Sequence, residues 1–146
     1  MSLHLEVVGT PAPQGSKRLV GKNLVEASAK VGPWREAVKW VAIRDGITAP
    51  MQGPIRVYIC FRLTRPKGHY RNDGCDSRVK ASAPAYPIVK PDLDKLVRCT
   101  LDALTDAGVW RDDSQVVRVE ARKEYTILAS GALIIVEPLG VLNETE

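Results

Sequence analysis

The segment KPDLDKLVRCTLDALTDAG, residues 90–108, has the clearest helical pattern in the chain. Its apolar side chains recur every three or four residues and form one stripe along a helix. The stripe comprises Leu93, Leu96, Val97, Thr100, Leu101, Leu104 and Ala107. Pro91 suits the first helical turn and Gly108 ends the pattern, so we predict a helix over 91–107 that packs against the core.

Weaker patterns on both sides of this segment indicate a mixed fold. Alternation of apolar and polar residues predicts strands over 3–8, 55–63, 114–127 and 132–136. Helical spacing predicts a second helix over Pro33–Arg44. A chain of 146 residues fits one domain. We therefore expect an α/β (α+β) fold, a single small domain with a mixed sheet packed by two main helices.

The domain is expected to span residues 1–138, followed by a C-terminal tail over 139–146. Residues 64–89 show no period and combine proline, glycine and basic residues. A stretch of this length without regular structure is usually functional or disordered in a compact domain. We expect a flexible basic segment there that becomes ordered on DNA.

The charges are unevenly distributed along the chain. The formal net charge is +4, which by itself is weak evidence for a polyanionic partner. Basic residues gather between Arg56 and Lys90, whereas acidic residues cluster between Asp92 and Asp113. A basic region beside an acidic cluster is what a metal-dependent nuclease needs, but ordinary surface charge explains this distribution equally well.

Several classes of protein are disfavoured by the sequence. The three cysteines, Cys60, Cys75 and Cys99, lack a close Cys-x-x-Cys spacing, which argues against a disulfide framework and against a zinc finger. The first residues lack the basic and long apolar regions of a secretory signal. No apolar run approaches the roughly 20 residues that cross a bilayer. We expect a protein of the reducing cytoplasm with no membrane partner.

Carboxylates mark the start of the predicted central helix. Asp92 and Asp94 lie where free amides and the helix dipole favour negative charge. An ideal helix separates residues two apart by about 200°, so both point at one site only if Asp92 lies in an irregular first turn. Asp94, Arg98 and Asp102 follow one another at a spacing of four and share one face.

A second acidic pair, Asp112 and Asp113, follows the far end of this helix. A helix of about four and a half turns separates this pair from Asp92. Either the following strand folds back toward Asp92, or the last carboxylate comes from another subunit. Sequence geometry leaves both alternatives open.

These residues suit phosphodiester hydrolysis. Hard divalent cations such as Mg²⁺ take carboxylate and water ligands, activate water and relieve negative charge on phosphate. A cation such as Arg98 would stabilise the additional negative charge of the transition state. In the structural alternative, Asp92 is a helix cap, Asp94 and Arg98 form a surface ion pair, and Asp112-Asp113 is a turn.

The motif as a whole resembles the RusA family of Holliday junction resolvases, the crossover junction endodeoxyribonucleases. The shared pieces are Lys-Pro-Asp-x-Asp-x-Leu, Asp-Ala-Leu and Gly-x-Trp-x-Asp-Asp-x-Gln. In this chain they are Lys90–Leu96, Asp102–Leu104 and Gly108–Gln115. Weaker similarity extends to Gly9–Gly15 and to the order of strands and helices.

The resemblance implies a homodimeric fold that binds four-way junctions and makes paired nicks with Mg²⁺, with Mn²⁺ as the expected substitute. Asp92, Asp94 and Asp113 match the family's catalytic carboxylates, and Asp112 matches the neighbouring acid, which we expect to join them at the metal. Arg98 stands where the family often has an essential lysine. Because arginine stays protonated near neutral pH, we expect an electrostatic role for it.

The resemblance and the distribution of cations also predict a DNA-binding surface. Its expected residues are Lys17, Arg18, Arg65, Lys67, Arg71, Lys90 and Lys95. Lys95 stands where the family commonly has asparagine.

We therefore expect a structure-specific endodeoxyribonuclease that resolves Holliday junctions in DNA recombination and repair, in the cytoplasm of a bacterial or phage-infected cell. Compact resolvases of this family are often phage products. No protein partner beyond a second copy is implied. The alternatives are a broader nuclease for flaps and forks, and a non-enzymatic DNA-binding module whose aspartates are caps and ion pairs.

Overall fold

Four strands form one mixed sheet in the order β1-β6-β4-β5. They are β1 (Leu3–Val8), β4 (Ile55–Thr64), β5 (Val116–Thr126) and β6 (Gly131–Pro138). Strand β6 runs antiparallel to both β1 and β4, whereas β4 and β5 are parallel. Parallel neighbours need a long crossover connection, and here that connection carries a helix. The edges of the sheet are β1 and β5.

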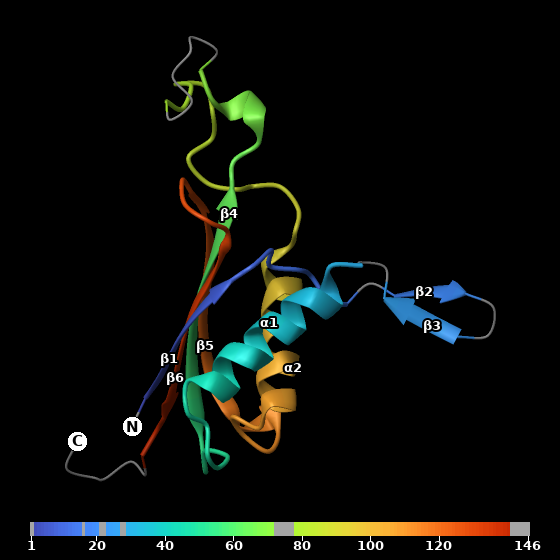
Figure 1. Cartoon of the computed structure of the whole chain (residues 1–146), viewed down its shortest axis with the longest axis vertical. Coiled ribbons are helices and arrows are strands. Elements are labelled where there is room, and N and C mark those ends of the chain that lie inside the picture. Colours follow the sequence, from blue (N-terminus) through green and yellow to red (C-terminus); the bar gives the residue numbers. More distant parts are fainter. Residues whose placement is uncertain (1, 16, 21–22, 27–28, 72–77, 141–146) are drawn as a thin grey trace.

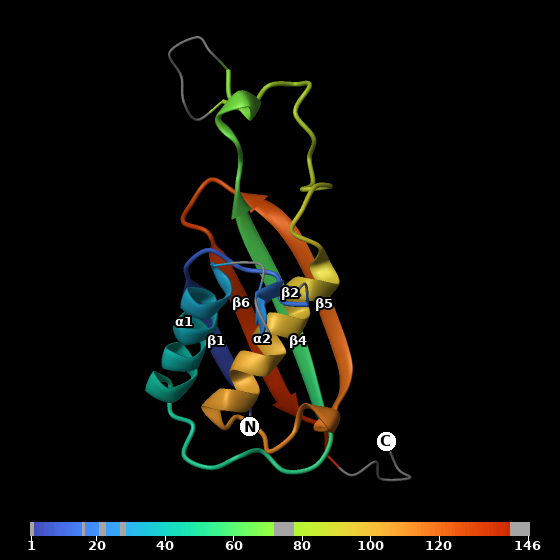
Figure 2. The ribbon, with the colours of Figure 1, turned by 90° about the vertical axis from the view of Figure 1, so that its right-hand side faces the viewer.

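Both helices cover one face of this sheet (Figures 1 and 2). They are α1 (Val31–Arg44) and α2 (Leu93–Ala107). The core lies between the helices and the sheet, and its largest fully buried side chains include Trp34, Trp110 and Phe61. Trp34 of α1 donates its indole N–H to Thr100 Oγ1 of α2 over 3.1 Å, so this buried polar pair is satisfied. The expected α+β architecture with two main helices is confirmed.

The computed structural model describes residues 2–15, 17–20, 23–26, 29–71 and 78–140. Neither helix in this part of the chain is long and apolar enough to cross a membrane. The expected C-terminal tail has residues 141–146 outside the described ranges.

Two predicted boundaries shift because of local turns. Helix α2 begins at Leu93 rather than at Pro91, because Asp92 is the N-cap with extended backbone angles, φ −69° and ψ 137°. The strand predicted from residue 114 begins at Val116, since Asp113–Gln115 form a short 3₁₀ helix, η2. Strand β1 has the predicted bounds.

The structure adds a hairpin that the sequence pattern did not predict. Strands β2 (Lys17–Val20) and β3 (Asn23–Glu26) pair antiparallel, and Figure 1 shows them projecting from the body of the protein. Four residues are too few to show a periodic pattern, so local alternation could not reveal these strands.

The predicted basic segment over 64–89 contains one short 3₁₀ helix, η1 (Lys67–His69), and an isolated bridge between Tyr70 and Val79. Residues 72–77 of this segment lie outside the described ranges. Figures 1 and 2 show the segment extending beyond the β4 end of the sheet and descending to the start of α2. Its ordering on DNA stays a prediction.

Candidate active site

The first turn of α2 presents two exposed carboxylates, Asp92 and Asp94, called here the N-terminal pair. Asp92 makes no side-chain capping bond, although its carbonyl accepts from the amide of Leu96 over 3.1 Å. Its carboxylate forms an ion pair with Lys95 Nζ at 3.3 Å. Because Asp92 has extended backbone angles, the angular separation of an ideal helix does not apply to this pair. The irregular first turn that the sequence required is present.

A loop from the N-terminal region crosses the α2 face that carries Asp94, Arg98 and Asp102. The amide of Gln14 donates to the carbonyl of Lys95 over 3.0 Å, and its side-chain nitrogen donates to Asp102 Oδ2 over 2.5 Å. Gly15 follows with φ +147°, and a Cβ there would lie 3.5 Å from the guanidinium of Arg98. Asp102 is therefore committed to holding this loop, while Arg98 lies exposed beside it.

The second acidic pair, Asp112 and Asp113, is held in the η2 turn and is called here the turn pair. Asp112 Oδ1 accepts from the amide of Ser114 over 2.9 Å. Gln115 Oε1 accepts from the amide of Asp112, and its Nε2 donates to the carbonyls of Met51 and Gly53 over 3.0 and 3.1 Å. Asp112 thus builds the turn, as the structural alternative expects, and the turn presents the exposed carboxylate of Asp113.

The two members of the turn pair differ in their electrostatics. The backbone hydrogen bond from Ser114 lowers the pKa of Asp112. Desolvation, together with the neighbouring Asp112, raises the pKa of Asp113. The negative charge of Asp113 is therefore uncompensated within its own turn. A divalent cation placed there would reverse this effect, because a nearby positive charge favours the ionised carboxylate.

The N-terminal pair lies at the start of α2 and the turn pair follows the end of this helix in η2, so the two pairs lie at opposite ends of α2, whose course is shown in Figure 2. A helix of 15 residues is about 22 Å long. Strand β5 returns along the sheet parallel to β4, but Asp113 precedes this strand and stays at the far end. The strand therefore does not bring Asp113 back to Asp92 within one chain. Across the described ranges, no three Asp, Glu, His or Cys side chains gather as a metal site.

Comparison with protein families matches residues 7–137 of the 146-residue chain to endodeoxyribonuclease RusA. The chain belongs to the RusA endodeoxyribonuclease family. It is thus an endodeoxyribonuclease of the Holliday junction resolvase type, from a family that acts on branched DNA and generally depends on a divalent metal. A search among curated proteins gave no match. The matched range contains α1, α2 and both acidic pairs.

Within this RusA-family fold, two predicted DNA-binding cations, Lys90 and Lys95, flank Asp92, and others lie in the basic segment that precedes α2. Lys67 is exposed on η1, and Lys90 is exposed two residues before Asp92. Arg71 is exposed, and its amide donates to the carbonyl of Arg78 over 2.8 Å. Lys95 faces Asp92, as described above. Lys17 and Arg18 lie on β2, where the structure describes the backbone alone.

Arg65, another predicted DNA-binding residue, is engaged within the chain. Its guanidinium lies 4.3 Å from the ring centroid of Tyr125 and donates to the carbonyl of Pro84 over 2.8 Å. His69 packs edge-on against the same tyrosine ring. Arg65 therefore fastens the basic segment to β5. Only the part of the Arg65 guanidinium that does not contact Pro84 or Tyr125 is left to bind DNA.

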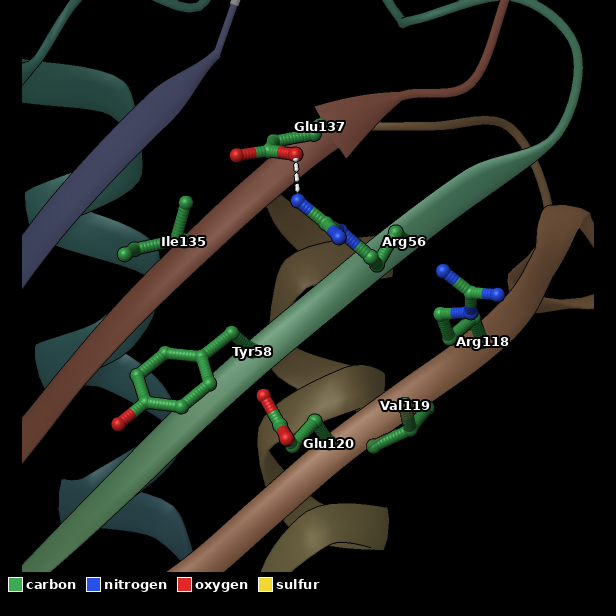
Figure 3. Close-up of a pocket in the computed structure, with 7 residues that line it drawn as sticks. All are labelled: Arg56, Tyr58, Arg118, Val119, Glu120, Ile135 and Glu137. Carbon is green, nitrogen blue, oxygen red and sulfur yellow. Dashed lines mark hydrogen bonds and ion pairs between the residues drawn. The ribbon is translucent and has the colours of Figure 1, made fainter.

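An open pocket of about 600 Å³ lies on the sheet face away from the helices (Figure 3). The residues that line the pocket on this face, called here the bare face, are Arg56, Tyr58, Arg118, Val119, Glu120, Ile135 and Glu137. Arg56 pairs with Glu137, as the dashed line in Figure 3 marks. Neither acidic pair lines this pocket, so the RusA motif and the pocket occupy different faces.

Sequence reasoning missed Gln14, Gln115 and Lys123 as residues that support the site. Gln115 belongs to the quoted motif, which was the one available indication of its role. Gln14 and Asp102 are 88 residues apart, so no spacing within one segment reveals their contact. Lys123 donates hydrogen bonds to the carbonyls of Val89 and Pro91, just before Asp92. The alternating pattern around Lys123 predicts a strand but gives no sign of these partners.

Proposed function

We propose that this RusA-family chain is a Mg²⁺-dependent nuclease that resolves Holliday junctions by paired nicks during DNA recombination and repair. The observation that carries the proposal is the N-terminal pair, two exposed carboxylates at the positive end of α2, with the exposed Lys90 two residues before Asp92. Mg²⁺ is typically bound through one or two protein carboxylates, waters and substrate phosphate oxygens. The donor set therefore fits this ion, with Mn²⁺ as a substitute.

In this proposal Asp92 and Asp94 hold the cation from one side, and a turn pair supplies Asp113 and Asp112 from the other. The bound cation supplies an activated water and stabilises charge on the phosphate. Arg98, on the α2 face of Asp94, binds a phosphate oxygen and stabilises the charge that develops on it. Lys95 balances the charge of Asp92 and contacts the DNA backbone with Lys90.

The distance between the acidic pairs leads us to propose that a second copy of the chain completes each site. Strand β5 is an edge strand with a free backbone ladder, which soluble proteins usually cover or interrupt. Arg118, Glu120, Arg122 and Glu124 alternate in sign along one face of this strand. Val119 pairs in register with the buried Val57 but is 42% exposed at this edge of the sheet, where it also lines the pocket of the bare face. This edge is suited to an antiparallel copy of itself.

Charge complementarity narrows the register of such a pairing. Antiparallel pairing centred on Val119 sets Arg118 opposite Glu120 of the partner subunit, and the same contact recurs by symmetry. It also sets Val116 opposite Arg122 of the partner subunit. Asp113, three residues earlier, then falls opposite Tyr125 of the partner subunit, two residues from Lys123 of the partner subunit, the residue that binds the segment before Asp92. One homodimer would thus assemble two composite sites.

A second register, centred on Ala121, also pairs opposite charges, because it sets Arg118 opposite Glu124 and Glu120 opposite Arg122. It moves Asp113 about 13 Å farther along the partner strand than the first register does. We favour the register centred on Val119 because it satisfies the charges and completes the site.

A labelled synthetic four-way junction tests the proposed function. With Mg²⁺ we expect symmetric nicks in opposite strands, and no cutting when a chelator removes the metal. Flap, fork and linear duplex substrates of the same sequence serve as controls. Equal cutting of flaps and forks would favour a broader branched-DNA nuclease. Tight binding without cutting in any metal would favour a DNA-binding module.

Cysteine cross-linking tests the proposed dimer. Val119→Cys places two thiols on the twofold axis, where paired Cα atoms about 4.5–5.5 Å apart allow a disulfide. We expect a covalent dimer on a non-reducing gel after mild oxidation. Cys75, which lies outside the described ranges, is first replaced by serine, whereas Cys60 and Cys99 are buried.

The matched control is Ala121→Cys in the same background, which we expect to stay monomeric on the gel. Cross-linking of this variant in place of Val119→Cys would assign the second register. A monomer in sedimentation, with neither variant cross-linked, would overturn the dimer.

A nuclease that cuts DNA junctions must act in the compartment that contains the DNA. We therefore propose the cytoplasm of a bacterial or phage-infected cell as its place of action.

A further inference from the structure

Lys123 on β5 makes two hydrogen bonds that no feature of the family motif requires. It pairs in register with Phe61, which is fully buried on the helix-covered face of the sheet, so its side chain extends toward the helices. Its Nζ donates to the carbonyl of Val89 over 2.7 Å and to the carbonyl of Pro91 over 2.9 Å. Both acceptors lie in the three residues before Asp92.

These bonds matter because little else ties this segment to the sheet. No backbone–backbone hydrogen bond joins 87–91 to a strand in the part of the chain that the structure describes. Asp92 itself has no side-chain capping bond to fix its orientation. A pocket of about 230 Å³ lies against the segment, lined among others by Leu63, Val89, Pro91 and Tyr125. The two hydrogen bonds from Lys123 therefore tie this segment to β5.

We propose that Lys123 is a positioning residue for the metal carboxylates. An ammonium–carbonyl pair is a charge-assisted hydrogen bond and is stronger than a neutral one. Two such bonds fix the peptide groups at Val89 and Pro91 and thereby set the direction in which Asp92 leaves the segment. Some groups do not touch a metal but orient the residues that bind it. Removal of such a group typically weakens metal binding by about 10- to 100-fold.

This inference rests on the proposed function, since it assumes that Asp92 and Asp94 bind the cation. Its test is therefore metal binding by the free protein, with no DNA present. Free Mn²⁺ is followed by electron paramagnetic resonance during titration of wild type, Lys123→Met and Lys123→Arg. Methionine keeps the apolar stem and removes the donors and the charge.

We expect Lys123→Met to weaken Mn²⁺ binding about tenfold and Lys123→Arg to restore part of it, because arginine keeps a charged donor. The concentration of Mg²⁺ that gives half-maximal junction cutting should rise by a similar factor. The rate at saturating Mg²⁺ and the affinity for the junction in chelator should stay close to wild type.

Unchanged Mn²⁺ affinity in a folded Lys123→Met protein would overturn the inference. An equal loss of rate at every Mg²⁺ concentration would overturn it as well, because that pattern indicates a general defect. If Lys123→Met does not fold, Lys123→Gln replaces it, because glutamine keeps a donor and removes the charge; unchanged Mn²⁺ affinity in that folded variant overturns the inference, and a loss of about tenfold supports it.

Lys39→Met is the matched control, because Lys39 is a partly exposed lysine on α1 and shows no ion pair in the described ranges. Wild type that binds Mn²⁺ tightly but cuts no junction would contradict the proposed function and leave the role of Lys123 supported or refuted by the affinities alone.

Discussion

Asp92→Asn is expected to abolish junction cutting, with a loss of at least about a thousandfold, while the affinity for the junction stays within about twofold. Asparagine keeps the shape of the side chain but removes the negative charge that a hard cation needs. Loss of a helix cap cannot explain the loss of cutting, because the Asp92 side chain accepts no hydrogen bond from an amide of α2. The substitution therefore costs little stability, and the melting temperature should change by no more than about 2 °C.

The measurement is single-turnover cleavage of a labelled junction, with binding followed separately by gel shift in the presence of Ca²⁺. Asp45→Asn is the control, since Asp45 is an exposed aspartate at the end of α1 that pairs only with Arg44 in the described ranges. It should cut at the wild-type rate. Wild-type cutting by Asp92→Asn would place the metal elsewhere and return Asp92 to a surface role.

Mixing two inactive proteins is expected to restore cutting. Asp92→Asn and Asp113→Asn each disable both sites of their own homodimers. In a mixed dimer, one composite site contains both substitutions and the other contains neither. Random exchange makes about half of the dimers mixed, so about a quarter of the wild-type number of sites should be intact. These dimers should nick one strand and leave the opposite strand whole.

The control for this mixing experiment is Asp92→Asn mixed with Asp94→Asn. Both substitutions lie in the N-terminal pair, so in a mixed dimer each site carries one of them and no cutting should return. Subunit exchange is verified with one protein carrying an affinity tag. No rescue between Asp92→Asn and Asp113→Asn, with exchange demonstrated, would mean that each chain builds its own site.

Local pattern predicted the parts of this fold in which one face of an element packs against the core. The apolar stripe of α2 and the alternation of β1 each repeat over several residues, which is enough to define a period. Strands β2 and β3 have four residues each and left no such trace. The parallel pairing of β4 and β5 depends on the intervening crossover, which no alternation within either strand encodes.

The sequence predicted which residues form the candidate site but only part of their arrangement in space. Spacing identified Asp92 and Asp94 and the irregular turn that they require, and the structure contains that turn. Spacing set Asp113 beyond the far end of α2 but left open whether the following strand folds back toward Asp92, and the fold shows that Asp113 stays at that far end because it precedes β5. Arg65 shows a different limit, because its stacking on Tyr125 joins residues 60 positions apart, a contact that no charge pattern reveals.

The position of Asp113 at the far end of α2 has a consequence for the cell. If two chains must meet before either site is complete, nuclease activity grows with the square of the protein concentration while subunits are scarce. A few stray molecules then leave the chromosome intact, and an abrupt onset of cutting follows once expression passes the dissociation constant of the dimer. The level of expression would thus control whether the enzyme is active.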